Sequence, residues 1–137
     1  MEIVIIEDEV FAARRLENLI KEYNPHYQVL AKLESVSESV KWFQKNDEPD
    51  LIFLDIHLED NLSFAIFNTI TVHCPVVFTT ATDELAVKAF LLKGIDFLHK
   101  PVVQDELYRM LDKYSALIKN YNKVIDSLFF NGIFSNK

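Results

Sequence analysis

Cysteine and long apolar runs are scarce in this sequence, and each absence excludes a class of protein. Cys74 is the only cysteine among the 137 residues, so an internal disulfide is impossible and we expect a small buried side chain. No apolar run approaches the roughly 20 residues of a membrane span, and the N-terminus lacks the pattern of a secretory signal. We therefore expect a cytoplasmic protein with no membrane partner.

Basic residues and glycines are also few. The formal net charge is −7, and an acidic chain without a basic patch is a poor candidate for direct nucleic-acid binding. Gly94 and Gly132 are the only glycines, whereas a dinucleotide- or flavin-binding module needs a glycine-rich turn after its first strand. Both classes are therefore excluded for this segment, whose length suits one domain.

Short apolar runs alternate with segments of helical spacing along the whole chain. Five runs are predicted to be strands: 3–6, 29–33, 51–54, 76–78 and 95–98. Five segments are predicted to be helices: 12–23, 35–43, 62–70, 82–94 and 107–121. Ser35 and Glu38 have the spacing of a capping box at the second helix. This order predicts an α/β doubly wound sheet of five parallel strands, whose functional crevice lies at the carboxyl ends of the strands.

Charged and hydroxyl side chains follow four of the predicted strands. Glu7 and Asp8 follow the first, Asp55 the third, Thr80 the fourth and Lys100 the fifth. Carboxylates that converge at one sheet edge repel one another, and Mg²⁺, which prefers oxygen ligands, would remove that conflict. Asp55 could then act as the nucleophile toward a phosphoryl group while Lys100 and Thr80 stabilise its oxygens.

Two details at this edge stay open in the sequence. Thr79 directly precedes Thr80, so the hydroxyl that faces the site could belong to either residue. Pro101 follows Lys100, which makes their peptide bond a candidate for the cis isomer, although only about 5–6% of such bonds are cis.

Four motifs at the strand ends together resemble the signatures of bacterial response-regulator receiver domains. The motifs are Ile5-Ile6-Glu7-Asp8-Glu9, Asp50-Leu51-Ile52-Phe53-Leu54-Asp55-Ile56, Phe78-Thr79-Thr80-Ala81 and Lys100-Pro101. The resemblance covers about residues 2–120 and implies a CheY-like sheet with strand order 2-1-3-4-5 and five helices. The stretches 75–81, 86–90 and 95–101 are most similar to receivers of LytTR-type two-component regulators.

The resemblance implies a role for each matching residue. Asp55 corresponds to the phosphoacceptor, which takes a phosphoryl group from a sensor histidine kinase. Glu7, Asp8, Asp55 and the backbone carbonyl of His57 correspond to the Mg²⁺ ligands. The phosphoryl-binding and switch positions correspond to Thr80, Ala81, Lys100 and Phe97. Phe97 lacks the hydroxyl of the tyrosine common at that position. Such a domain is not a conventional enzyme, because it assists only its own phosphorylation and dephosphorylation.

The predicted helix 82–94 is apolar nearly all the way round, which favours an interface. Its candidate interface residues are Leu85, Val87, Phe90 and Leu91. The resemblance implies homodimerisation through the surface of helix 4, strand 5 and helix 5. The alternative is deeper burial of this helix under neighbouring loops.

The resemblance also suggests how the chain is divided. We expect a receiver domain at 1–121, and at 122–137 either a C-terminal extension or the start of a linker. In LytTR-type regulators such a linker leads to a DNA-binding effector domain, and the output is transcriptional.

Two other functions fit parts of the pattern. A receiver-like interaction module that works without phosphorylation would keep the fold, although the complete set of Asp8, Asp55, Thr80 and Lys100 argues against it. An aspartate-nucleophile phosphohydrolase would need a second aspartate two residues after the nucleophile, where this chain has His57.

Overall fold

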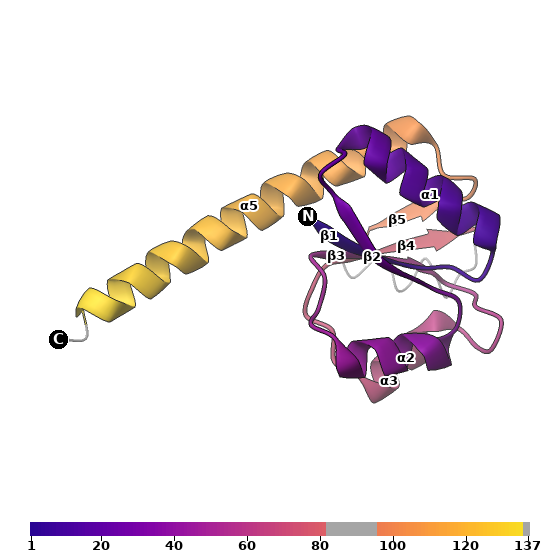
Figure 1. Ribbon diagram of the computed structural model, residues 1–137, viewed down its shortest axis with the longest axis horizontal. Helices are drawn as coiled ribbons and strands as arrows, with labels where there is room; N and C mark the ends of the chain where they lie inside the picture. The colour runs from indigo at the N-terminus through magenta and orange to yellow at the C-terminus, as the bar shows by residue number, and fades with distance from the viewer. Residues whose placement is uncertain (82–95, 136–137) are drawn as a thin grey trace.

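The computed structural model describes residues 1–81 and 96–135, which form a parallel five-stranded sheet flanked by helices (Figure 1). The strand order is β2-β1-β3-β4-β5, which confirms the predicted doubly wound topology. The strands are β1 (Glu2–Ile6), β2 (Gln28–Leu33), β3 (Leu51–Asp55), β4 (Val76–Thr80) and β5 (Phe97–His99). The helices are α1 (Val10–Tyr23), α2 (Val36–Lys45), α3 (Ile66–Thr69), preceded by a 3-10 turn (Ser63–Ala65), and α5 (Gln104–Ser135).

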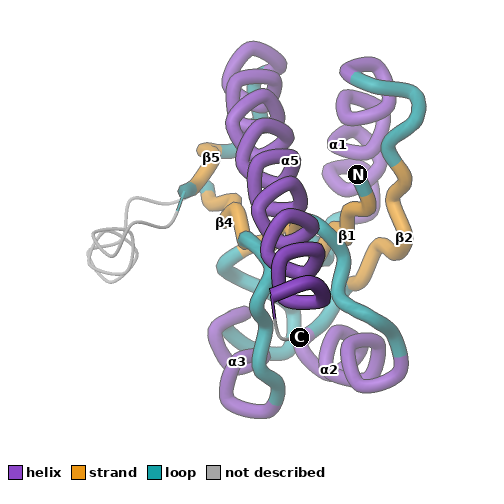
Figure 2. The backbone as a smooth tube through the Cα atoms, turned by 90° about the vertical axis from the view of Figure 1, so that its left-hand side faces the viewer, coloured by secondary structure: helices purple, strands orange, loops and turns teal. Residues whose placement is uncertain are grey.

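Both faces of the sheet are covered, and this explains why the central strands are apolar without alternation. In β1, Ile3 and Ile5 belong to a core cluster with α1 and the first turns of α5. Val4 and Ile6 point to the opposite face and belong to a second cluster that includes Ile66 of α3. Figure 2, turned by 90°, shows α1 and α5 on one side of the sheet and α2 and α3 on the other. Successive side chains of a strand alternate between faces, so a strand covered on both sides needs apolar residues at every position.

The first two helices form where the sequence predicts them. In α1 the buried residues Ala13, Leu16 and Ile20 repeat at helical spacing. At the start of α2, the Ser35 hydroxyl accepts a hydrogen bond of 3.0 Å from the backbone N–H of Glu38. The Glu38 carboxylate accepts one of 3.1 Å from the backbone N–H of Glu34, so two amides at this helix start are satisfied.

The predicted helix 62–70 is longer than the helical segment observed. Only Ser63–Ala65, as a 3-10 turn, and Ile66–Thr69 are helical. Ile70 is already extended, with φ −125° and ψ 154°, and it begins a run of three β-branched residues, Ile70, Thr71 and Val72. Such residues lose χ1 freedom in a helix, which favours its early end. The predicted helix 82–94 and its four interface candidates lie outside the described residues.

The last helix is longer than the predicted segment 107–121. α5 spans 32 residues, and its first turns lie on the sheet while the rest projects from the globular body (Figure 1). Leu107, Leu111 and Tyr114 anchor the covered part in the core. Of the helices that can be described, none combines the length and the apolar character needed to cross a bilayer.

Candidate functional site at the carboxyl edge of the sheet

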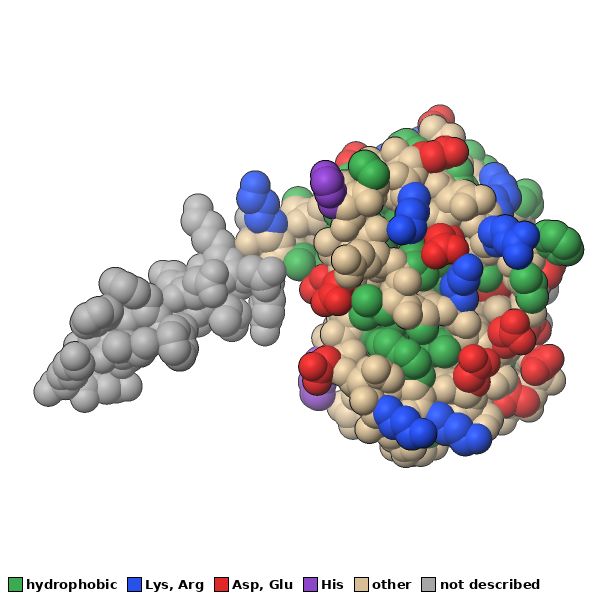
Figure 3. All heavy atoms as spheres, viewed as in Figure 1, with side chains coloured by type: hydrophobic (Ala, Val, Ile, Leu, Met, Phe, Trp, Pro, Cys, Tyr) green, Lys and Arg blue, Asp and Glu red, His purple; other side chains and the backbone are tan. Residues whose placement is uncertain are grey.

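The parallel register brings the predicted site residues to one edge. Ile6 lies opposite Leu54, Asp55 opposite Thr79, and Thr80 opposite His99. The residues that follow these positions therefore leave the sheet side by side, although up to about ninety positions separate them in sequence. Figure 3 shows acidic side chains gathered on the side of the body toward which the strands point.

Three carboxylates meet at this edge. Glu7, Asp8 and Asp55 each offer an oxygen, and these atoms all lie within 4.8 Å of one another. Glu7 is 5% exposed and Asp55 6%, so water screens their mutual repulsion poorly. Carboxylate oxygens are the ligands that Mg²⁺ prefers, and the three residues therefore fit a divalent cation.

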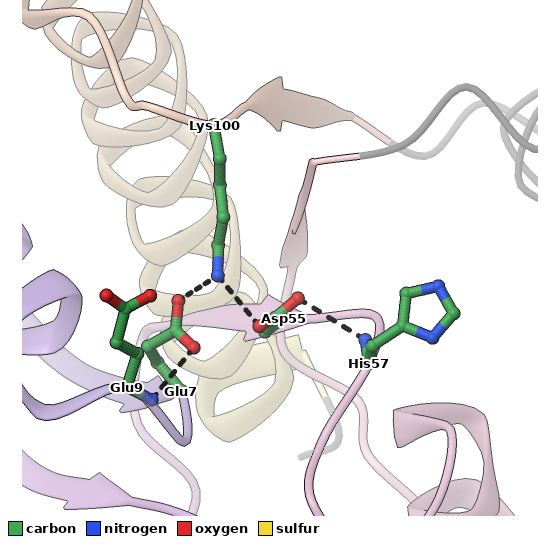
Figure 4. A network of polar contacts seen from close by, with 5 residues as sticks. All are labelled: Glu7, Glu9, Asp55, His57 and Lys100. Carbon is green, nitrogen blue, oxygen red and sulfur yellow. Dashed lines mark hydrogen bonds and ion pairs between the residues drawn. The ribbon is translucent and has the colours of Figure 1, made fainter.

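Lys100 supplies the one positive charge seen in this group. Its Nζ donates a 2.8 Å hydrogen bond to Asp55 Oδ2 and forms an ion pair with Glu7 Oε1 (Figure 4). One ammonium faces two nearly buried carboxylates, with Asp8 close by. The cluster therefore keeps an excess of negative charge, which is the condition that favours binding of a cation or a proton.

The pKa values follow from this imbalance. Burial, together with the neighbouring Asp55 carboxylate, raises the pKa of Glu7 from 4.5 to about 7, although Lys100 acts in the opposite direction. Burial disfavours the ammonium of Lys100, but its hydrogen bonds to Asp55 and Glu7 outweigh this effect and raise its pKa. Near neutral pH the site therefore holds a fully charged lysine and a Glu7 that exchanges a proton with solvent.

Backbone amides orient the two buried carboxylates. The N–H of Glu9 donates to Glu7 Oε2 at 3.2 Å, and the N–H of His57 donates to Asp55 Oδ1 at 3.3 Å. The imidazole of His57 points away from the carboxylates (Figure 4). Only the backbone of His57 therefore adjoins the cluster, and a ligand role for its carbonyl stays a prediction.

The expected switch residues lie at the end of β4, directly after it, and at the start of β5. Thr79 and Thr80 are both buried, with exposed fractions of 4% and 1%, and Ala81 follows them at the surface. Burial therefore does not decide which of the two hydroxyls faces the site. Thr79 also lines the same pocket as Lys100. Phe97 is half-buried, and its ring meets that of His99 edge-on, with centroids 4.9 Å apart. The Lys100–Pro101 peptide bond is cis.

An open pocket of about 490 Å³ beside Lys100 was not predicted. It runs between the start of α1 and the segment after β5, and its lining includes Phe11, Arg15, Pro101 and Val102. The guanidinium of Arg15 donates a 2.6 Å hydrogen bond to the carbonyl of Val102, which ties these two segments together. No spacing rule links residues so far apart, so only the folded chain reveals this pocket.

The expectation for Cys74 is met in part. Cys74 is a free thiol of intermediate burial rather than a fully buried one. Burial and the nearby Glu48 carboxylate raise its pKa to about 12, which keeps it protonated and unreactive.

Comparison with known proteins agrees with this fold and this edge. The family model of the response regulator receiver domain matches residues 3–112. Sensory transduction protein LytR of Staphylococcus saprophyticus is 37% identical over 116 residues, which cover 82% of this chain and 45% of that protein. Sensory transduction protein LytT of Enterococcus faecalis is 33% identical over 119 residues, covering 84% and 48%. The chain thus spans about half the length of the curated relatives it matches.

A solved structure gives the same result. The response regulatory domain of protein mrkE from Klebsiella pneumoniae is 28% identical, with a TM-score of 0.75 over 88% of this chain and 99% of that one. The family match, the sheet order and the relatives agree: this chain belongs to the receiver domains of response regulators and is similar to those of LytT- and LytR-type two-component regulators.

Proposed function

We propose that this chain accepts a phosphoryl group from a sensor histidine kinase onto Asp55 and thereby switches a bacterial, cytoplasmic response regulator. The observation that carries the proposal is the position of Asp55. It ends a fully buried strand, Lys100 holds it through a 2.8 Å hydrogen bond, and two further carboxylates lie within reach. A carboxyl with a raised pKa, as Glu7 has, in a cluster of charged groups is typical of reactive sites.

The transfer is a displacement at phosphorus. An oxygen of the Asp55 carboxylate bonds to phosphorus as the P–N bond of the kinase phosphohistidine breaks. The second ring nitrogen of the phosphohistidine carries a proton, so the imidazole leaves as a neutral group with the electron pair of that bond. Because Asp55 becomes an acyl phosphate, Lys100 then faces phosphoryl oxygens in place of a free carboxylate.

Mg²⁺ is the cofactor that the donor set favours. Glu7, Asp8, Asp55 and the backbone carbonyl of His57 would hold it, all through oxygen atoms. When bound, it neutralises charge on the carboxylates and on the transferring phosphoryl group. Glu7 must lose its proton to take part, and its pKa of about 7 lets it do so near neutral pH.

The residues next to the phosphoryl group would bind it and change position in response. A hydroxyl of Thr80 and the backbone of Ala81 would donate to phosphoryl oxygens, and the half-buried Phe97 would move into the space that the threonine vacates. We expect this change to reach the surface of the predicted helix 82–94, β5 and α5, and to control homodimerisation through Leu85, Val87, Phe90 and Leu91. Such a switch shifts populations because the phosphoryl group binds one state better.

The kinase would dock over the open pocket beside α1. Phe11, which is 77% exposed, lines the same pocket as Lys100, and Val103, which is 50% exposed, directly follows the lining residue Val102. Exposed apolar side chains around a reactive group favour a protein partner over a small metabolite.

The output would come from another segment of a longer protein. We propose residues 1–121 as the receiver and 122–137 as an extension or the start of a linker to an effector domain. LytR and LytT are sensory transduction proteins about twice as long as the matched region, which supports such an effector. A DNA-binding effector would make the output transcriptional, while the acidic receiver would not bind DNA itself.

Phosphorylation by acetyl phosphate with Mg²⁺, read by intact mass, tests the proposal. Asp55→Asn is the test variant, and Asp47→Asn, which removes an exposed carboxylate remote from the site, is the matched control. We expect Mg²⁺-dependent addition of one phosphoryl group to the wild type and the control, and none to Asp55→Asn. If the folded wild type binds Mg²⁺ but takes up no phosphoryl group from acetyl phosphate or from a kinase, the phosphorylation-independent module replaces this proposal.

A further inference from the structure

The projecting part of α5 has a feature that the phosphorylation site does not use. α5 has 32 residues, or about 48 Å of helix at 1.5 Å per residue. Leu107, Leu111 and Tyr114 are buried against the sheet, whereas the backbone beyond Ile118 leaves the globular body (Figure 1). No other described element runs beside that projecting part in Figure 1 or Figure 2.

Apolar residues repeat along the whole helix at alternating steps of four and three. The series is Leu107, Leu111, Tyr114, Ile118, Tyr121, Ile125 and Leu128. This average of 3.5 residues is the period of a coiled coil, in which it keeps one seam facing a partner helix. The domain's own core covers this seam as far as Ile118, which is only partly buried, and the same stripe of residues continues from there onto the projecting part of the helix.

The heptad assignment puts β-branched residues and leucine where a two-stranded coil favours them. Ile118 and Ile125 fall at position a, and Tyr121 and Leu128 at position d. Isoleucine at a with leucine at d favours parallel dimers. The pattern weakens after Leu128, because the next position a is Gly132.

The positions of the charged residues also allow two copies of this helix to pair. Lys119, Lys123 and Asp126 are the charged residues between 118 and 135, and all fall at outer positions b and f. Positions e and g, which flank the seam, hold Leu117, Asn122, Val124 and Phe129. Two identical helices would therefore bring no like charges together at these positions, and Leu117, the last flanking residue on the described surface, is 49% exposed.

We infer that a second copy of this chain pairs with the projecting part of α5, in parallel and in register, along residues 117–129. The two receivers would then share one helical stalk. This contact differs from the helix 4, strand 5 and helix 5 surface of the proposed switch, and it needs no phosphoryl group. Phosphorylation would accordingly rearrange two receivers already joined, rather than bring separate ones together.

Sedimentation equilibrium of the full, unphosphorylated chain tests this pairing. Leu128→Lys places a charge in the seam, and Ser127→Lys places the same charge on the same turn at outer position c. We expect a reversible dimer for the wild type, at least about tenfold weaker association for Leu128→Lys, and a change within about threefold for Ser127→Lys. Far-UV circular dichroism checks that both variants keep the helix.

Disulfide cross-linking tests the direction of pairing. In a Cys74→Ala background, Leu128→Cys should oxidise to a covalent dimer, since equivalent d positions meet across a parallel pair, and Ser127→Cys should not. A wild type that stays monomeric up to about 1 mM overturns the inference. So does a dimer that Leu128→Lys leaves intact, which would place the contact on another face. Neither outcome bears on phosphorylation of Asp55, because no phosphoryl donor is present.

Discussion

Glu7 and Asp96 each contact a lysine, and the pKa values of these two carboxyl groups shift in opposite directions. The acidic cluster consists of Glu7, Asp8 and Asp55 around Lys100. The Asp96 cluster lies just before β5. Asp96 Oδ2 there accepts hydrogen bonds from Lys113 Nζ at 2.5 Å and from Tyr114 Oη at 2.6 Å. Burial alone would raise the pKa of either carboxyl, yet that of Asp96 is lowered while that of Glu7 rises to about 7.

The deeper burial of Glu7 and the number of carboxylates per cation together explain the difference. Asp96 has one ammonium and one hydroxyl to itself, and their hydrogen bonds outweigh the cost of its partial burial. Lys100 divides its charge between Glu7 and Asp55, and Asp8 adds a third carboxylate nearby. In the Asp96 cluster one ammonium matches one carboxylate, and this balanced cluster holds β5 and α5 together. In the acidic cluster the carboxylates outnumber the ammonium, so this unbalanced cluster keeps affinity for a further positive charge. The unbalanced cluster is where we place the chemistry.

Removing the lysine from each cluster should give the largest contrast. Lys100→Gln removes the ammonium that would stabilise the transferring phosphoryl oxygens, so the rate of phosphorylation by acetyl phosphate should fall by about 10²-fold. Lys113→Gln alters only the Asp96 cluster, remote from Asp55, and its labelling rate should stay within about twofold of wild type. Intact mass against time measures both rates. Equal rates for the two variants would remove Lys100 from the proposed chemistry.

The balanced cluster should matter for stability instead. Asp96→Asn keeps the size of the side chain but loses its charge, so the free energy of unfolding should fall by about 1–2 kcal/mol in urea denaturation. The value is modest because Lys113 is half exposed and solvent screens the pair. Since the pKa of Asp96 is lowered, the contribution is present above its ordinary pKa of 3.8 and disappears as the pH falls through the lowered value. A variant as stable as wild type at pH 7 would contradict this assignment.

Glu7→Gln should change how the stability of the domain depends on pH. From pH 4.5 to about 7 the folded Glu7 keeps a proton that the unfolded chain has lost. The free energy of unfolding without divalent cations should therefore fall as the pH rises through this window, and the fall should be shallower in Glu7→Gln. Urea denaturation in EDTA at several pH values measures both slopes.

Magnesium gives a second test of the same carboxyl. Proton and metal compete for Glu7 in the proposed site, so Mg²⁺ should bind the wild type more tightly at pH 8 than at pH 6. Titration calorimetry should show a weaker pH dependence for Glu7→Gln. Affinities that do not change with pH in the wild type would mean that Glu7 is not a ligand.

The fold was predictable because its main signals are local or periodic. The apolar runs around Val4, Phe53 and Val77 are strands covered on both faces, and the spacing of Ser35 and Glu38 gives the start of α2. The short α3 was not predicted, because the apolar spacing of 62–70 concealed the β-branched run that begins at Ile70. α5 continues past the apolar stripe that predicted a helix at 107–121, into the residues for which a C-terminal extension or the start of a linker was expected.

The sequence by itself determined which residues reach the carboxyl edge. A parallel sheet sends every strand end to the same side, so Glu7, Asp8, Asp55 and Lys100 could be placed together from their order alone. Only the tertiary structure decided how they interact there: that Lys100 contacts both Glu7 and Asp55, that His57 faces the site with its backbone, and that Arg15 closes one side of a pocket. Periodicity fixes the face and the edge on which a residue lies. Distances, burial and pKa values depend on contacts between segments far apart in the chain, and these exist only once the sheet is assembled.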